Sequence, residues 1–355
     1  MAGVLKKVKA VLRLIRIHSL MVTALTPLLG ACATFTVLKG NFIPGDQIPM
    51  LFNIFLIGII IHIFGEILND YIDYDVDKAN IELSTKPLVS GDISKKGALI
   101  LMIISLIVLI VIGVFSRFNI LSLLIFIAAS VTGIIYQLKS KKWFHSAIFL
   151  SAWAFLIILF GGVYAGQYQN LLDVPALVYI ISILGFFHLW INTAILGHLK
   201  DVKNDAECGI RTFPMRFGVK VLGEGKSSRL IIPMNFKIFV LSIQAINLIV
   251  AFVPIIFYKM FYDGNVNMLL LFFGLVLLSV MILGSQFKIL WHKLFERNKL
   301  MRMMAIREIG TYCLAIVIIA PLIGWMLFLV FIFLPLIWFL LMNILFSGNP
   351  MQPSI

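Results

Sequence analysis

The chain contains the stretch Glu66-Ile67-Leu68-Asn69-Asp70-Tyr71-Ile72-Asp73-Tyr74-Asp75-Val76-Asp77, which places five carboxylates at the end of an otherwise almost purely apolar run. If the helix predicted to begin near Met50 continues through this stretch, Glu66, Asp70, Asp73 and Asp77 fall at i, i+4, i+7 and i+11 and share one helical face. Four like charges on one face repel one another, so a cation is expected opposite them. Several converging oxygen ligands favour Mg²⁺, which also binds phosphate oxygens.

The composition excludes a soluble globular protein. Hydrophobic residues make up 61% and charged residues 13% of the 355 residues, and the mean hydropathy is +1.05. No soluble core needs that much apolar surface. Uncharged runs close to the ~20 residues that cross a bilayer predict eight spans, at residues 19–38, 50–68, 97–116, 118–137, 146–166, 175–199, 236–258 and 266–287.

The C-terminal region contains a longer apolar run. Residues 309–346 form 38 consecutive uncharged positions, which at ~1.5 Å per residue is too long for a single crossing. Residues 309–346 therefore form a ninth helix and, if the chain breaks at Ala320-Pro321-Leu322-Ile323-Gly324, one extra helix. The sequence therefore predicts an all-α, polytopic membrane bundle of nine or ten transmembrane helices.

The basic residues gather on one side of the predicted membrane. Of the 29 lysines and arginines, 26 fall in or beside the loops of one side, and only Lys39, Arg117 and Lys259 belong to the other. Positive charge marks the cytoplasmic side, so the acidic stretch is predicted to face the cytoplasm. The net charge of +13 therefore mainly reflects the many basic residues of the cytoplasmic loops. No nucleic-acid partner is predicted, because the charges are dispersed over loops.

The two ends of the chain are expected to lie outside the bundle. Residues 1–17 are basic with apolar positions at helical spacing, and they predict an amphipathic helix at the membrane interface. A cleaved signal peptide is the alternative, although the first apolar run is longer than a signal peptide usually carries. The transmembrane domain is expected to cover residues 18–346, and residues 347–355 form a C-terminal tail.

Further polar motifs end spans on the same side. Lys86-Pro87 follows the acidic stretch in a turn that can present one cation to it. Tyr136 and Lys139 end the fourth span, and Asp201 and Asp205 follow the sixth at i and i+4. Four spans separate the two acidic motifs, so both reach the same membrane face. A solvated helix end explains Asp201 and Asp205 taken alone, but carboxylates beside the membrane are costly and usually functional.

These motifs resemble those of the UbiA-type intramembrane prenyltransferases. The resemblance is carried by Asn69-Asp70-x-x-Asp73-x-x-x-Asp77, Tyr136-x-x-Lys139 and Asp201-x-x-x-Asp205. It implies a helical bundle around a central cavity, binding of an isoprenyl diphosphate through Mg²⁺, and transfer of the prenyl chain to a lipophilic acceptor. The acceptor would be a quinone or aromatic precursor or a lipid of the geranylgeranylglyceryl phosphate type. One departure from the family pattern is Lys86-Pro87, where many members have Arg-Pro.

The resemblance also implies a role for each motif residue. The metal ligands would be Asn69, Asp70, Asp73, Asp77, Asp201 and Asp205. The diphosphate would be contacted by Asn69, Lys86, Lys139 and Arg211. The catalytic residues would be Asp73, Asp201, Tyr136 and Lys139.

Two alternative functions stay open from the sequence. A membrane terpene cyclase of the same fold would ionise the same diphosphate and let the chain attack itself. A cation transporter would also place acidic residues at interrupted membrane helices. Transporter sites typically lie near the bilayer midplane, whereas both acidic motifs here lie at helix ends on one face.

Overall fold

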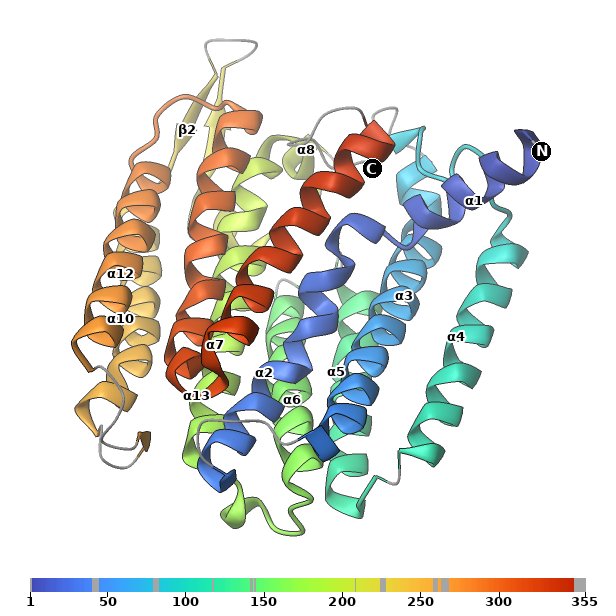
Figure 1. Cartoon of the computed structure of the whole chain (residues 1–355). Helices are drawn as coiled ribbons and strands as arrows, with labels where there is room; N and C mark the ends of the chain where they lie inside the picture. Colours follow the sequence, from blue (N-terminus) through green and yellow to red (C-terminus); the bar gives the residue numbers. More distant parts are fainter. Residues whose placement is uncertain are drawn as a thin grey trace.

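The computed structural model of the chain is a bundle of long, roughly parallel and antiparallel helices (Figure 1). It describes residues 2–39, 45–78, 83–116, 118–140, 143, 145–207, 209–223, 228–257, 261–262 and 268–347. The long helices are α1 (Ala2–Leu14), α2 (Leu20–Lys39), α3 (Ile48–Lys78), α4 (Lys95–Phe115), α5 (Ile120–Lys139), α6 (Ser146–Gly166), α7 (Ala176–Leu189), α10 (Met234–Ile256), α12 (Met268–Leu290) and α13 (Arg297–Ser347).

The predicted all-α membrane fold is confirmed. Within the described residues, ten helical segments are long and apolar enough to cross a membrane. The tenth arises because α13 contains Gly324 at φ 74° and ψ 161°, a backbone conformation outside the helical region. Positive φ suits glycine, which has no Cβ. The chain therefore turns back at the end of the predicted 320–324 break, giving spans at Arg297–Gly324 and Met326–Phe346.

The last span packs against the beginning of the first. The indole Nε1 of Trp338 donates a hydrogen bond to the carbonyl of Ile17 at 2.6 Å, and the rings of His18 and Phe339 meet edge to face with centroids 5.8 Å apart. Both ends of the described chain consequently lie at the same end of the bundle (Figure 1).

Glycines set the close approach of α2 and α6. A Cβ on Gly161 would lie 1.9 Å from the carbonyl oxygen of Pro27, and one on Gly30 would lie 1.9 Å from the carbonyl oxygen of Ile158. Small residues at such crossings let two membrane helices pack backbone to backbone. This contact fixes the centre of the bundle.

Replacing Gly161 by Ala is expected to lower the free energy of unfolding by about 1–3 kcal/mol, because the added methyl group must push two backbones apart. The matched control is Gly284→Ala on α12, where a Cβ meets no other atom within 4 Å. Thermal unfolding in detergent measures both variants. Equal stability of the two would contradict the close packing described here.

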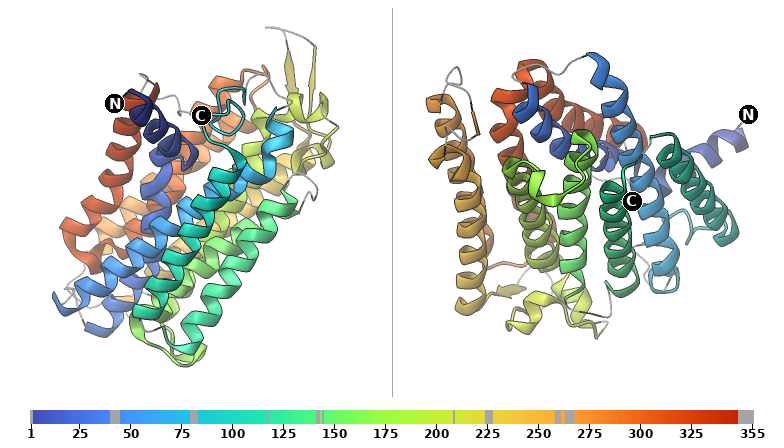
Figure 2. Two further views of the ribbon diagram at one scale, coloured as in Figure 1. Left: turned by 90° about the vertical axis from the view of Figure 1, so that its right-hand side faces the viewer. Right: turned by 90° about the horizontal axis from the view of Figure 1, so that it is seen from below.

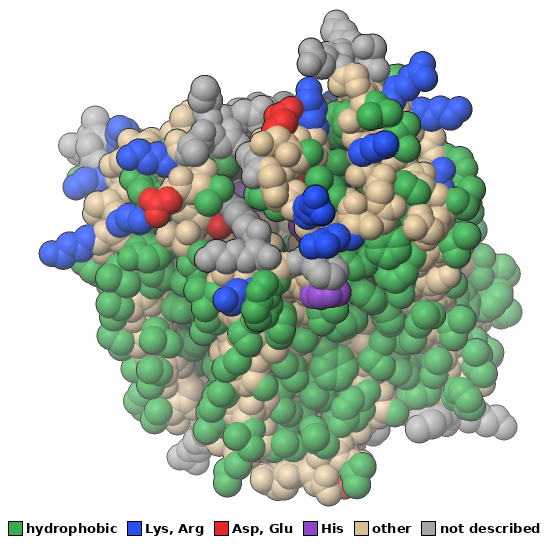
Figure 3. Space-filling view, turned by 180° about the vertical axis from the view of Figure 1, so that it is seen from behind, with side chains coloured by type: hydrophobic (Ala, Val, Ile, Leu, Met, Phe, Trp, Pro, Cys, Tyr) green, Lys and Arg blue, Asp and Glu red, His purple; other side chains and the backbone are tan. Residues whose placement is uncertain are grey.

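Charged side chains gather at one end of the bundle, above a broad apolar band (Figure 3). The apolar band continues over α4, where Ile103, Ile107 and Ile110 are exposed. Exposed apolar surface of this extent on a long helix suits lipid contact and not water. The distribution fits an integral, multi-pass membrane protein.

The segment between the sixth and seventh spans contains small elements that the sequence did not predict. They are α8 (Val202–Glu207), α9 (Phe213–Arg216) and an antiparallel hairpin of β1 (Lys220–Leu222) and β2 (Arg229–Ile231). Figure 2 shows the hairpin projecting beyond the helix ends. An isolated bridge between Arg229 and Leu294 ties the hairpin to the segment before α13.

Two spans carry the acidic motifs. Helix α3 runs unbroken from Ile48 to Lys78, so the predicted acidic face forms on a single helix. The sixth span instead changes from α7 to a π-helical segment, η5 (Trp190–Leu196), and then to a 3₁₀ turn, η6 (Gly197–Lys200), which ends at Asp201. Single π-helical turns are frequent at functional sites.

Candidate active site

The acidic face of α3 holds two buried carboxylates around one cation. Asp70 and Asp77 are 4% and 3% exposed, and they lie two helical turns apart on the same face. The Nζ of Lys86 lies 3.0 Å from Asp70 Oδ1 and 2.8 Å from Asp77 Oδ2. The turn after α3 therefore returns its lysine to the acidic face, and the role of Lys86 in binding a diphosphate stays a prediction.

Arg16 supplies a second cation to the same face. Its guanidinium lies 2.8 Å from Glu66 Oε2 and 3.0 Å from Asp70 Oδ1. Burial alone would lower the pKa of Arg16, but the charges of Glu66 and Asp70 outweigh this effect and raise its pKa above the ordinary value. Arg16 stays cationic at any working pH, and it places Asp70 between two basic side chains.

The other α3 residues are more accessible. Asn69 and Asp73 are half-buried, and Asp75 lies on a different face, with an 85% exposed carboxylate that is 3.8 Å from Lys95. Tyr136 on α5 is also half-buried, and Asp73 and Glu66 are the acidic groups close enough to act on it electrostatically. The structure therefore places Tyr136 near the first acidic motif, and its catalytic role stays a prediction.

The second acidic motif is fixed by a different cation. Arg297, at the start of α13, reaches Asp201 Oδ1 at 3.2 Å, and Lys200 lies 4.0 Å from Oδ2. Asp205 is half-buried one turn later, and its backbone N–H donates to the carbonyl of Asp201 at 2.8 Å.

Two of the predicted phosphate-binding residues point elsewhere in this structure. The Nζ of Lys139 lies over the indole of Trp143, 4.9 Å from the ring centroid, in a cation–π contact. Arg211 is exposed in the segment between α8 and α9. The contact of both residues with a diphosphate stays a prediction.

An apolar cavity opens beside the first acidic motif. It has a volume of about 330 Å³, and its lining includes Glu66, Tyr136 and Gln137 among apolar side chains of α3, α4, α5 and α6. A cavity of this size, with polar groups at one edge, is typical of a site for a largely apolar ligand.

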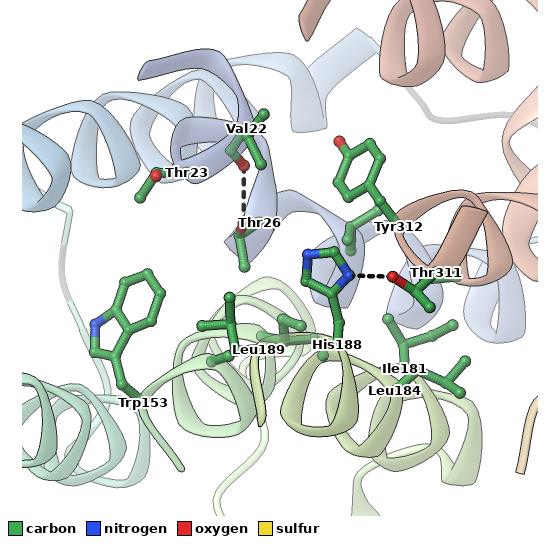
Figure 4. A pocket seen from close by; sticks show the side chains of 15 residues that line it. Val22, Thr23, Thr26, Trp153, Ile181, Leu184, His188, Leu189, Thr311 and Tyr312 are labelled. Carbon is green, nitrogen blue, oxygen red and sulfur yellow. Dashed lines mark hydrogen bonds between the residues drawn. The ribbon is translucent and has the colours of Figure 1, made fainter. Parts of the chain in front are cut away.

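A smaller cavity of about 90 Å³ adjoins it. Thr23, Trp153 and Leu189 line both cavities and form the wall between them. Figure 4 shows the His188 ring directed at Thr311 of α13, with Tyr312 above it. His188 Nδ1 lies 2.8 Å from the Thr311 hydroxyl.

Several polar residues within the membrane spans make hydrogen bonds between helices. His62 Nδ1 lies 3.1 Å from the hydroxyl of Thr23, and Asn192 Nδ2 donates to Thr311 at 2.9 Å. Arg307 is 0% exposed. Its guanidinium donates hydrogen bonds to the side-chain amide oxygens of Gln286, Gln244 and Asn192 on other helices. These bonds hold α13 to the sixth, seventh and eighth spans.

The α3 carboxylates fit a divalent cation in their chemistry. All candidate ligands offer oxygen, the donor that Mg²⁺ prefers, and Asp70 and Asp77 already converge on one ammonium group. Within the described residues, no group of three or more His, Cys, Asp or Glu side chains is close enough to hold a metal ion. The six-residue ligand set therefore stays a prediction.

Two site residues were missed in the sequence. Arg16 and Arg297 were counted only as positive charges on the cytoplasmic side, yet each pairs with a motif carboxylate. Arg16 stands directly before the first apolar run, and this position beside the membrane is the one sequence signal that sets it apart. Arg297 has no comparable signal.

Comparison with known proteins identifies the family. The sequence model of the UbiA prenyltransferase family matches residues 24–305. The digeranylgeranylglyceryl phosphate synthase of Hyperthermus butylicus is 25% identical over 222 residues, which is 61% of this chain and 70% of that protein. The 4-hydroxybenzoate geranyltransferase 2 of Lithospermum erythrorhizon is 30% identical over 154 residues, which is 43% of this chain and 48% of that protein.

Solved structures share the fold. One, from work on digeranylgeranylglyceryl phosphate synthase in membranes, has a TM-score of 0.62 at 20% identity and covers 88% of this chain and 97% of its own. A UbiA homolog from Archaeoglobus fulgidus bound to GPP and Mg²⁺ has a TM-score of 0.56 at 17% identity, with 86% and 99% covered. The helical bundle, the acidic motifs and the family match agree: the chain is a prenyltransferase and belongs to the UbiA prenyltransferase family.

Proposed function

We propose that the chain transfers an isoprenyl group from its diphosphate, held through Mg²⁺ at the cytoplasmic face, to a lipophilic acceptor. The observation that carries this proposal is the pair of buried carboxylates, Asp70 and Asp77, converging on one cation beside an apolar cavity of about 330 Å³. A UbiA homolog of the same fold binds GPP and Mg²⁺, which supports the same ligands here.

The carboxylates of the two motifs would hold the metal and so anchor the diphosphate. The proposed ligands are Asn69, Asp70, Asp73, Asp77, Asp201 and Asp205. When bound, Mg²⁺ neutralises the charge that develops on the leaving diphosphate. Lys86, Lys139 and Arg211 are proposed to contact phosphate oxygens, as charge-assisted hydrogen bonds are short and strong.

The cavity beside Tyr136 would hold the prenyl chain. Its apolar lining keeps water away from the allylic cation that forms when the C–O bond to diphosphate breaks. The aromatic face of Tyr136 can stabilise that cation, since electron-rich rings attract positive charge. The acceptor then attacks the same carbon.

The acceptor is proposed to be a lipid alcohol of the geranylgeranylglyceryl phosphate type. The relative from Hyperthermus butylicus carries the name of a digeranylgeranylglyceryl phosphate synthase, and its match covers more of both chains than that of the plant 4-hydroxybenzoate geranyltransferase. A phenolic acid is the second acceptor to test.

A transfer assay on the purified protein tests the proposal. It uses labelled geranylgeranyl diphosphate, Mg²⁺, and either geranylgeranylglyceryl phosphate or 4-hydroxybenzoate, with chelator as the control. Labelled lipid product that disappears with chelator is the expected result. Diphosphate release with every acceptor unlabelled would favour a terpene cyclase, and ion flux in liposomes without any turnover would favour a transporter.

A further inference from the structure

Glu308 is a carboxylate within the ninth span that the proposed site does not use. It lies in the middle of the span Arg297–Gly324, and its side chain is exposed, whereas the neighbouring Arg307 is fully buried. Acidic residues within membrane spans are costly, face protein interiors or cavities, and usually act in function. Glu308 therefore needs an explanation beyond packing.

The helical spacing places Glu308 on the cavity side of α13. Thr311 and Tyr312 follow it at i+3 and i+4, so all three share one face. Thr311 and Tyr312 line the smaller cavity (Figure 4). Helix α13 begins at the charged end of the molecule, so Glu308 lies one turn nearer to that end than Thr311 and Tyr312. Helical side chains tilt toward the helix N-terminus, so the Glu308 side chain also tilts toward the charged end.

The charged neighbours of Glu308 connect it to the second acidic motif. Lys200, which directly precedes Asp201, and Arg307 are the basic groups that act on its carboxylate electrostatically. Their positive charge offsets part of the cost of a carboxylate at this depth. Glu308 is thus close enough to Lys200 to feel its charge, and it lies one helical turn from Thr311 and Tyr312, which line the smaller cavity.

The carboxylate of Glu308 is available for a ligand. Arg307 directs its N–H groups to Gln286, Gln244 and Asn192, and no hydrogen bond or ion pair to the Glu308 side chain occurs among the described residues. On α3, in contrast, Glu66, Asp70 and Asp77 are engaged by Arg16 and Lys86.

We propose that Glu308 is the catalytic base that accepts the proton of the acceptor hydroxyl. The inference rests on the proposed function, in which an alcohol oxygen forms a bond to the allylic carbon as the C–O bond to diphosphate breaks. The electron pair of the broken bond leaves with the diphosphate, and the hydroxyl proton passes to the Glu308 carboxylate. A positioned base typically raises the rate of such a step by roughly 10²–10⁴-fold.

The test compares Glu308→Gln with the matched control Glu296→Gln, which removes an exposed carboxylate just before α13 that is paired with the exposed Lys299. Single-turnover transfer to geranylgeranylglyceryl phosphate is expected to fall about 100-fold or more in Glu308→Gln and to stay unchanged in the control. Binding of geranylgeranyl diphosphate with Mg²⁺ is expected to be equal in both. Near-normal transfer, or lost donor binding, in Glu308→Gln would overturn the proposal.

Chemical rescue separates a base from a structural residue. In Glu308→Ala, added formate is expected to restore a measurable part of the transfer rate, while chloride at the same ionic strength does not. Glu308→Asp retains the carboxylate on a shorter side chain and serves if the neutral variants fail to fold; its transfer rate is expected to fall below that of the wild type while donor binding is kept. Absence of rescue in a folded Glu308→Ala would speak against proton transfer to this residue.

The wild-type protein distinguishes failure of this inference from failure of the proposed function. If the wild type transfers label and Glu308→Gln does so equally well, only the role of Glu308 is wrong. If the wild type itself transfers label to neither acceptor, the proposed function is wrong.

Discussion

Asp73→Asn is expected to lower prenyl transfer by about 100- to 1,000-fold while the protein stays folded. The carboxylate of Asp73 is a proposed metal ligand on the acidic face of α3, and neutralising the leaving diphosphate is usually the largest single contribution to such a reaction. Asp73 is half-buried, so an isosteric amide is tolerated by its surroundings. Transfer from labelled geranylgeranyl diphosphate at saturating Mg²⁺ measures the loss.

The same helix offers a control for this substitution. Asp75 is two residues away on a different face, with an 85% exposed carboxylate, and Asp75→Asn is expected to leave transfer unchanged. Asp201→Asn, in the second motif, is expected to behave like Asp73→Asn. Full activity of Asp73→Asn or Asp201→Asn would show that the two acidic motifs do not bind the metal and the diphosphate.

Lys86→Met is expected to destabilise the protein by about 3–5 kcal/mol in the presence of chelator, because it removes the cation that the buried carboxylates of Asp70 and Asp77 share. Lys86 is the shared partner of Asp70 and Asp77. Added Mg²⁺ is expected to restore part of the lost stability, since it can take the place between the two carboxylates. Thermal unfolding in detergent, with chelator and with Mg²⁺, measures both effects.

Lys95→Met is the comparison for the lysine variant. Lys95 is 42% exposed and lies 3.8 Å from Asp75, and exposed pairs of this kind contribute little. Its stability is expected to match the wild type with and without metal. A Lys86→Met protein that is equally insensitive to Mg²⁺ would mean that Asp70 and Asp77 do not form part of a metal site.

The membrane fold was predictable because a single physical requirement governs it. A span must be apolar over about 20 residues, and the charge-free runs mark nearly every helix. The acidic face of α3 was predictable for a related reason: helical periodicity continues through Glu66 to Asp77 without a glycine or proline to interrupt it. The turn at Gly324 was predictable from the residue itself, because glycine accepts a positive φ.

The parts that escaped prediction depend on contacts between distant segments. Arg16 meets Asp70 across 54 residues and Arg297 meets Asp201 across 96, and no local pattern encodes either pairing. The π-helical turn at Trp190–Leu196 lies in a run that reads as an ordinary helix. The β1–β2 hairpin lacks the alternation of a longer strand pair, so its sequence reads as a loop.

The hydrogen bond from Trp338 to Ile17 spans 321 residues and bears on how the bundle assembles. Contacts this distant in sequence slow folding, since nearly the whole chain must be ordered before they form. The equilibrium cost is modest, because loop-closure entropy grows only with the logarithm of loop length. We therefore expect the last span to pack against the bundle late in folding. It should also be the first span to detach when the protein is heated or pulled from its C-terminal side.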